Sequence, residues 1–143
     1  MKIGDTLHFG RHRMVRVGHD RTDLYVEGDV VNADVDVIHQ CGLTMRAECG
    51  YDLMLVDVSK MGNLSPETRR YTGVVSAGER NYHGAIAITG ASLLTRALLT
   101  LFFRALELIR RTPNVTNPIS FFASRDEALA WLDAQRARIQ SSL

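Results

Sequence analysis

The chain has 143 residues, a formal net charge of +1, and 45% hydrophobic against 23% charged residues. This length allows one domain with one sizeable core and is too short for two ordinary domains. The balanced charge gives no reason to expect nucleic acid as a partner, because domains that read phosphates usually concentrate basic residues on one face. Of the 17 basic residues 15 are arginine, a bias typical of a GC-rich genome.

The sequence also indicates a compartment. The first twenty residues contain arginines and histidines but no apolar segment typical of a signal peptide. No apolar run approaches the ~20 residues that span a bilayer. Cys41 and Cys49 lie outside any CxxC or paired histidine motif, which favours two reduced thiols. We therefore expect a cytoplasmic protein without disulfide, metal or cofactor.

The amino-terminal third predicts a β-hairpin followed by a helix. Met14–Val17 and Leu24–Val26 are short extended runs separated by turn-forming residues. Apolar residues then recur at spacings of three and four, which predicts a helix over Ala33–Glu48. Asn32 is its expected N-cap and Gly50 its expected end.

The middle of the chain predicts two buried strands and a helix between them. Tyr51–Val58 contains a continuous apolar run, as expected for a strand covered on both faces. Lys60–Asn63 is expected to form a short loop. Ser65 suits an N-cap and Pro66 the first helical position. Gly84–Thr89 is the second predicted strand.

The carboxyl-terminal part predicts a long helix over Ala91–Arg111, a short strand over Pro118–Phe122 and a last helix capped by Ser124. The inner face of that last helix falls within Ala128–Leu132. Strands alternating with helices favour a mainly parallel sheet with right-handed crossovers. The fold class is therefore α/β, with about five strands and about four helices in one domain that opens with a hairpin.

The long helix has a wider apolar arc than the roughly 100° stripe of an ordinary surface helix. Its polar stripe includes Arg96, Thr100 and Arg104, with Leu99 and Phe103 expected beside that stripe. Three uses remain open for the arc: a helix buried in the core, a homodimer interface, or the wall of a lipid pocket with peripheral membrane contact. The residues that would form the interface or line the ligand are Leu94, Leu98, Leu101, Phe102, Phe103 and Leu106.

Three segments resemble the STAS domain superfamily, in its SpoIIAA-like branch. Residues 24–29 form a strand that ends in Gly-Asp, and residues 53–59 form a strand that ends in Asp-Val-Ser. Residues 124–132 are similar to the terminal helix of that branch, which is likened to CRAL-TRIO lipid-binding domains. The resemblance covers most of the chain and implies a single SpoIIAA-like domain over residues 1–143, with a regulatory role exerted through protein contacts.

The resemblance departs from the family at the phosphorylation site. Anti-sigma-factor antagonists of the superfamily carry Asp-Ser-Ser-Gly between loop and helix, where this chain has Ser65-Pro66-Glu67-Thr68. The phosphoacceptor position falls at or near Pro66, which has no hydroxyl. The usual phosphoserine switch is therefore expected to be missing.

Four polar residues form the candidate interaction or phosphorylation loop: Asp57, Ser59, Ser65 and Thr68. Ser65 could receive a phosphate at the helix N-terminus, although a neutral capping hydroxyl is the simpler role. Asp57 at a strand end suggests a receiver domain, but that chemistry also needs a late lysine and Lys60 is the last one. Asp57 is instead expected to bond nearby backbone.

No catalytic motif is present, and the five histidines are scattered, so we expect a protein that is not an enzyme. The leading prediction is a regulatory or protein-interaction module acting through residues 59–71. The alternative is a protein that binds a small apolar ligand or lipid and contacts the inner membrane peripherally.

Overall fold

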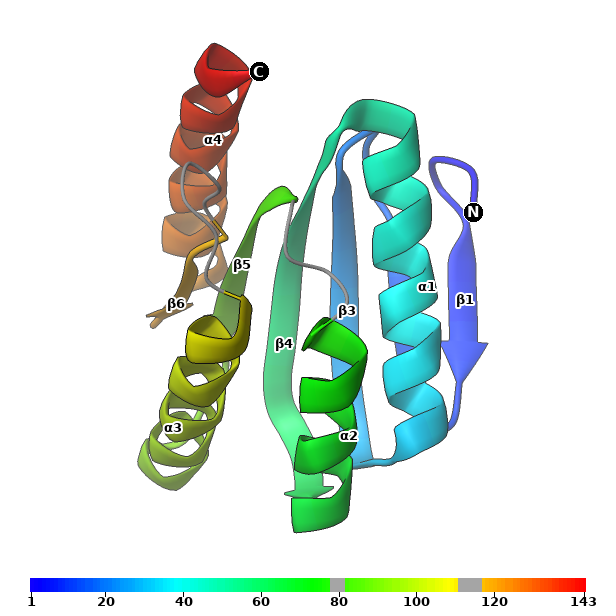
Figure 1. Cartoon of the computed structure of the whole chain (residues 1–143), viewed down its shortest axis with the longest axis vertical. Helices are drawn as coiled ribbons and strands as arrows, with labels where there is room; N and C mark the ends of the chain where they lie inside the picture. The colour runs from blue at the N-terminus through cyan, green and yellow to red at the C-terminus, as the bar shows by residue number, and fades with distance from the viewer. Residues whose placement is uncertain (78–81, 111–116) are drawn as a thin grey trace.

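In a computed structural model of the chain, which describes residues 1–77, 82–110 and 117–143, one six-stranded sheet carries four helices (Figure 1). The strands lie in the order of the sequence. The first two pairings are antiparallel and the remaining three are parallel. The element bounds are β1 Thr6–Phe9, β2 His12–Arg16, β3 Arg21–Val30, α1 Asn32–Cys49, β4 Tyr51–Leu64, α2 Pro66–Ala77, β5 His83–Thr89, α3 Leu93–Arg110, β6 Ile119–Phe122 and α4 Arg125–Ser142.

The strand order dictates where the helices lie. From β3 to β6 each parallel strand is added on the same side of its predecessor. Right-handed crossovers that all advance in one direction place their helices on one face of the sheet. Figure 1 shows α1, α2 and α3 on that face and α4 behind the opposite one. The α/β class, the opening hairpin and the mainly parallel sheet are confirmed.

Two apolar clusters follow from the alternation of side chains along the strands. Met54, Val56 and Val58 of β4 face the three-helix side, whereas Leu53 and Leu55 face α4. Ala85 and Ala87 on β5 are almost fully buried, and their small side chains let α4 approach the sheet closely. Both faces of the parallel strands are thus covered, as the apolar run in β4 predicts.

A buried polar cluster joins α4 to the opposite end of the chain. Asp20, only 2% exposed, accepts hydrogen bonds from Arg136 Nε at 2.6 Å and Nη2 at 3.0 Å. The hydroxyl of Tyr51 donates to the same carboxylate at 2.6 Å. Burial, together with the hydrogen bond to Asp20, raises the pKa of Tyr51 to about 12. These bonds hold the carboxyl-terminal half of α4 against the amino-terminal end of β4.

The structure corrects two local expectations in the first half of the chain. The sequence pattern does not indicate β1 as a separate strand, yet β1 pairs with β2. The N-cap of α1 is Val31, whose N–H donates to Asp34 Oδ2 at 3.0 Å. Asn32 is therefore the first helical residue, and an acidic side chain in the first turn does the capping.

The largest correction concerns β4. The predicted loop over Lys60–Asn63 is strand, because β4 continues to Leu64 and pairs with the bulged end of β3. The strand then leads directly into α2, without the short loop. Gly62 permits this pairing, because a Cβ there would lie 2.9 Å from the carbonyl carbon of Gly28. A glycine typical of a turn serves here for close backbone approach.

A candidate ligand cavity

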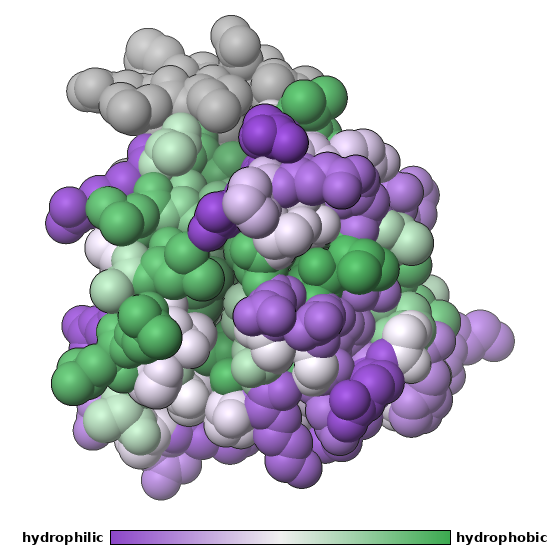
Figure 2. All heavy atoms as spheres, turned by 90° about the horizontal axis from the view of Figure 1, so that it is seen from below, coloured by the Kyte–Doolittle hydropathy of each residue, from purple (hydrophilic) through white to green (hydrophobic). Residues whose placement is uncertain are grey.

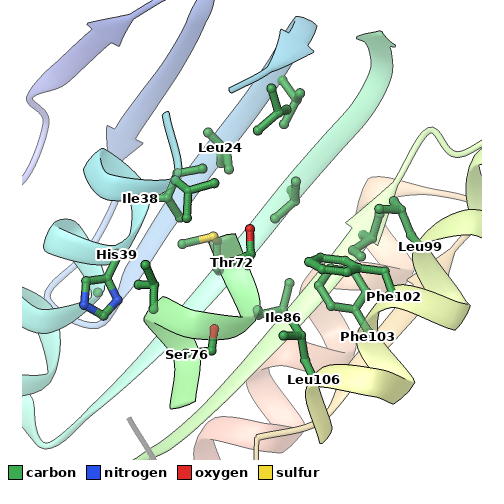
Figure 3. Close-up of a pocket in the computed structure, with 18 of the residues that line it drawn as sticks. Leu24, Ile38, His39, Thr72, Ser76, Ile86, Leu99, Phe102, Phe103 and Leu106 are labelled. Carbon is green, nitrogen blue, oxygen red and sulfur yellow. The ribbon is translucent and has the colours of Figure 1, made fainter. Parts of the chain in front are cut away.

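A cavity of about 220 Å³ lies between the sheet and the three helices that cover it (Figure 3). Its floor is formed by alternate residues of the three central strands, including Leu24, Val56 and Ile86. Its walls come from α1 on one side and α3 on the other, and α2 crosses between them. Figure 3 shows Ile38 of α1 and Phe102 of α3 on opposite sides of this space.

The space exists because α2 carries small side chains on its inner side. Thr72, Val75 and Ser76 are the α2 residues that line the cavity. Protein interiors are close-packed and rarely leave voids larger than a water molecule. The side chains of threonine, valine and serine are too short to fill the space between the helix and the branched strand residues. Leucine or phenylalanine at these positions would fill it. The small side chains of α2 are therefore the reason why the cavity exists.

The α3 wall is strongly apolar. It consists of Leu99, Phe102, Phe103 and Leu106, and Leu99 is only 4% exposed. The two phenylalanine rings lie 5.2 Å apart in a tilted arrangement, which is a favourable aromatic geometry. These four residues recur at intervals of about one helical turn, and no polar side chain stands between them among the described residues that line the cavity.

Polar groups gather at the α1 end of the cavity. Arg46 Nη1 lies 3.3 Å from Asp52 Oδ2, and the guanidinium stacks on the ring of Tyr82 at 3.8 Å. Among the lining residues that the structure describes, Arg46 and Asp52 are the only arginine, lysine, aspartate or glutamate, and their charges offset one another. Gly42 leaves room for the guanidinium, because a Cβ there would lie 2.7 Å from Arg46 Nη1.

The six apolar candidates that the sequence names on α3 divide between the cavity and other positions on the helix. Phe102, Phe103 and Leu106 line the cavity. Leu94 and Leu101, candidates for an interface or a ligand wall, point to the surface with exposed fractions of 81% and 69%. Leu98 is half-buried and does not line the cavity. Leu99 is buried, although the sequence pattern places it beside the polar stripe of the helix. The side of α3 that carries Leu99 packs with strand residues in the apolar core.

The predicted phosphorylation loop is not a compact site. Asp57 and Ser59 lie within β4, and Asp57 Oδ1 accepts the N–H of Ser59 at 2.9 Å, so its expected bond to nearby backbone is confirmed. Ser65 lies eight residues after Asp57, which corresponds to roughly 25 Å along an extended strand. Its hydroxyl accepts the N–H of Thr68 at 3.1 Å, which confirms the N-cap. The strand therefore separates the four candidate residues into two pairs.

The thiols and one histidine have structural roles in the described part of the chain. Cys41 and Cys49 are free, and burial raises the pKa of both thiols, which disfavours the reactive thiolate. His12 is buried; its Nδ1 accepts the N–H of Glu27, and its Nε2 lies 3.1 Å from Asp34 Oδ2. No group of three or more metal-ligating side chains occurs among residues 1–77, 82–110 and 117–143.

Within the same residues, no helix combines the length and apolar character needed to cross a bilayer. No protein-family model matches the chain, and its sequence matches no curated protein. The resemblance to STAS domains therefore stays a prediction. Fold and geometry define an α/β domain with an apolar cavity between its central sheet and three helices.

Proposed function

We propose that this protein binds a small, uncharged apolar ligand in the cavity between the sheet and α1, α2 and α3. The cavity of about 220 Å³, lined mainly by aliphatic and aromatic side chains, is the observation that carries the proposal. An apolar cavity of about 150 Å³ accommodates benzene, so this one suits a somewhat larger molecule.

The charges around the cavity support an uncharged ligand. Arg46 and Asp52 lie on the polar side as a close pair, so neither sign of charge is in excess. A ligand carboxylate would have to compete with Asp52 for Arg46. Burying an unpaired charge costs far more than burying an alkyl chain. A neutral head group avoids this cost.

The hydroxyl of Thr72 supports an alcohol or phenol as that head group. Thr72 Oγ1 donates its proton to the carbonyl of Thr68 at 2.8 Å. Its oxygen can still accept a hydrogen bond from a ligand hydroxyl. Figure 3 places the side chains of Thr72 and Ser76 on the helix that crosses the cavity. The proposed ligand is thus an apolar body with a hydrogen-bond donor.

Calorimetric titration with decanol and decanoate tests this proposal. We expect decanol to bind with one site per chain and decanoate to bind at least about tenfold more weakly, because its charge is desolvated. Thr72→Val should weaken decanol binding about fivefold, the equivalent of one hydrogen bond of ~1 kcal/mol. No saturable heat with decanol would overturn the proposal.

Two neighbouring valines on α2 provide a matched pair of variants. Val75 lines the cavity, whereas Val74 is 74% exposed. Val75→Phe should fill the cavity and abolish decanol binding, and Val74→Phe should bind as the wild type does. Equal binding by both variants would place the ligand elsewhere.

A second proposed function is a non-catalytic regulatory module that acts through residues 59–71. The observation that favours it is exposure: Ser59, Lys60, Asn63 and Glu67 all point to solvent around the junction of β4 and α2. Affinity capture from the native cell with the wild type and with a Lys60→Ala, Asn63→Ala double variant tests it. A partner retained equally by both proteins would argue against this surface.

A further inference from the structure

The outer side of α3 is apolar although it faces solvent. Leu93, Leu94 and Leu101 have exposed fractions of 89%, 81% and 69%. Figure 2 shows hydrophobic surface gathered on the side of the molecule that α3 occupies in Figure 1. The opposite side of the same helix lines the cavity. A helix that is apolar on both sides normally has both sides covered.

The charge around this surface indicates what covers it. Helices α2 and α3 together contain five arginines and two glutamates, a net charge of +3 in a chain whose total is +1. The rest of the chain therefore carries a net charge of −2. Arg96 is exposed between Leu94 and Leu101, and Arg104 is exposed three residues after Leu101. Arg70 of α2 is exposed as well. The surface is both apolar and basic.

We propose that α3 lies on an anionic membrane surface, with Leu93, Leu94 and Leu101 inserted among the lipid chains and the arginines at the head groups. Helices that lie in the membrane interface combine an apolar face with arginine or lysine beside it. Long arginine side chains can keep their charge in the head-group layer while their stems contact apolar surface. Basic residues near the bilayer are attracted by anionic lipids.

The charges favour a lipid surface over a second copy of the chain. Two copies joined through α3 would bring Arg104 and Arg96 of one chain toward the same arginines of the other, and like charges repel. The position of the cavity directly behind α3 also suits a membrane, which is a source of apolar ligands. Docking itself does not depend on the cavity, so it extends the proposed function without resting on it.

Sedimentation with lipid vesicles tests the docking. We expect the full chain to bind vesicles of phosphatidylcholine mixed with phosphatidylglycerol, and to bind pure phosphatidylcholine far more weakly. Raising the salt concentration should weaken binding, because the attraction between surface charges is screened. Failure to bind the mixed vesicles would overturn the proposal.

Substitutions on α3 then locate the contact. The double variant Leu94→Gln, Leu101→Gln should lower vesicle affinity at least about tenfold, because both leucines lose apolar burial. Ile3→Gln, at a residue 61% exposed near the N-terminus, is the matched control and should bind normally. Unchanged vesicle binding by the double variant would overturn the proposal. It would also be overturned if the wild type bound no vesicles and formed a homodimer that the double substitution dissociates.

The two proposals fail in different ways. Val75→Phe alters the cavity and leaves the outer side of α3 intact, so it should lose decanol binding and retain vesicle binding. Loss of vesicle binding in Val75→Phe alone, with the leucine variant unaffected, would contradict docking through α3.

Discussion

Asp20 and Arg136 form the ion pair that holds the last helix on the sheet. The carboxylate is 2% exposed and the guanidinium donates to both of its oxygens. Removing one partner of a buried pair leaves an uncompensated charge, which costs about 3–5 kcal/mol. Because the Arg136 side chain is 26% exposed, we expect the lower end of that range for Arg136→Met.

Urea unfolding of Arg136→Met measures this loss. Arg138→Met is the control, because Arg138 bonds to Gln135 on an exposed surface of the same helix. The control should change the free energy of unfolding by less than about 1 kcal/mol. Equal losses in the two variants would show that Asp20 contributes nothing specific.

The same carboxylate predicts how stability depends on pH. Burial alone would raise the pKa of Asp20, but the hydrogen bonds from Arg136 and Tyr51 and the charges of Arg136 and His19 outweigh burial and hold the pKa below its usual 3.8. The unfolded chain therefore takes up this proton first as the pH falls. The contribution of Asp20 is complete above about pH 5 and is lost as the pH falls through about 4 toward the lowered value.

Unfolding experiments between about pH 7 and 3 test this dependence. Asp20→Asn should be less stable than the wild type at neutral pH, and it should lose less stability on acidification. Parallel pH profiles for the two proteins would contradict the assignment.

At the scale of elements, Ser65 begins α2 and thereby positions the helix that crosses the cavity. Its hydroxyl accepts the N–H of Thr68. Ser65→Ala should lower the free energy of unfolding by about 1 kcal/mol, and Ser65→Asp should restore most of it, because aspartate is also a good N-cap. Thermal unfolding of the three proteins checks this order. An alanine variant as stable as the wild type would exclude the cap as a contributor.

Gly62 determines how far β4 extends. A Cβ at this position would meet backbone atoms of Gly28 and Asp29 at 2.9 and 3.0 Å. Gly62→Ala should therefore cost about 1–3 kcal/mol, as overpacking does. Gly18→Ala is the control, since no atom lies within 4 Å of its Cβ position. Circular dichroism during urea unfolding measures both, and a neutral Gly62→Ala would contradict the close approach.

These two residues show what sequence reasoning can and cannot predict. The caps at Ser65 and Ser124 depend on residues within one helical turn, and both predictions are confirmed. The extension of β4 depends on pairing with β3, more than thirty residues earlier. A glycine followed by asparagine indicates a turn in isolation, so the distant strand could not be anticipated.

The cavity could likewise be predicted only in part from the sequence. The sequence indicates that α3 is unusually apolar and names six candidate residues for an interface or a ligand wall, of which Phe102, Phe103 and Leu106 line the cavity. The free volume, however, depends on how far the small residues of α2 stand from the sheet. Thr72, Val75 and Ser76 form the expected helix but carry no pattern that distinguishes a cavity wall from an ordinary packed face. Their significance is visible only with α1 and α3 in place.

At the scale of the whole molecule, the two faces of the sheet have different roles. The α4 face is closely packed, with Ala128, Leu132 and Ile139 at 1% exposure or less. The three-helix face contains the cavity and carries the exposed leucines of α3 on its outside. One face thus stabilises the fold, and the other is proposed to bind an apolar ligand and to contact a membrane.

The most direct test of the proposed function is a methyl NMR titration of the full chain with decanol. We expect saturable shift changes at cavity methyl groups, including those of Ile86, Ile88, Leu99 and Leu106. The methyl groups of Leu53, Leu55 and Leu132 on the α4 face should change little. Shift changes confined to the α4 face or to the exposed leucines, or no saturable change at all, would contradict ligand binding in the cavity.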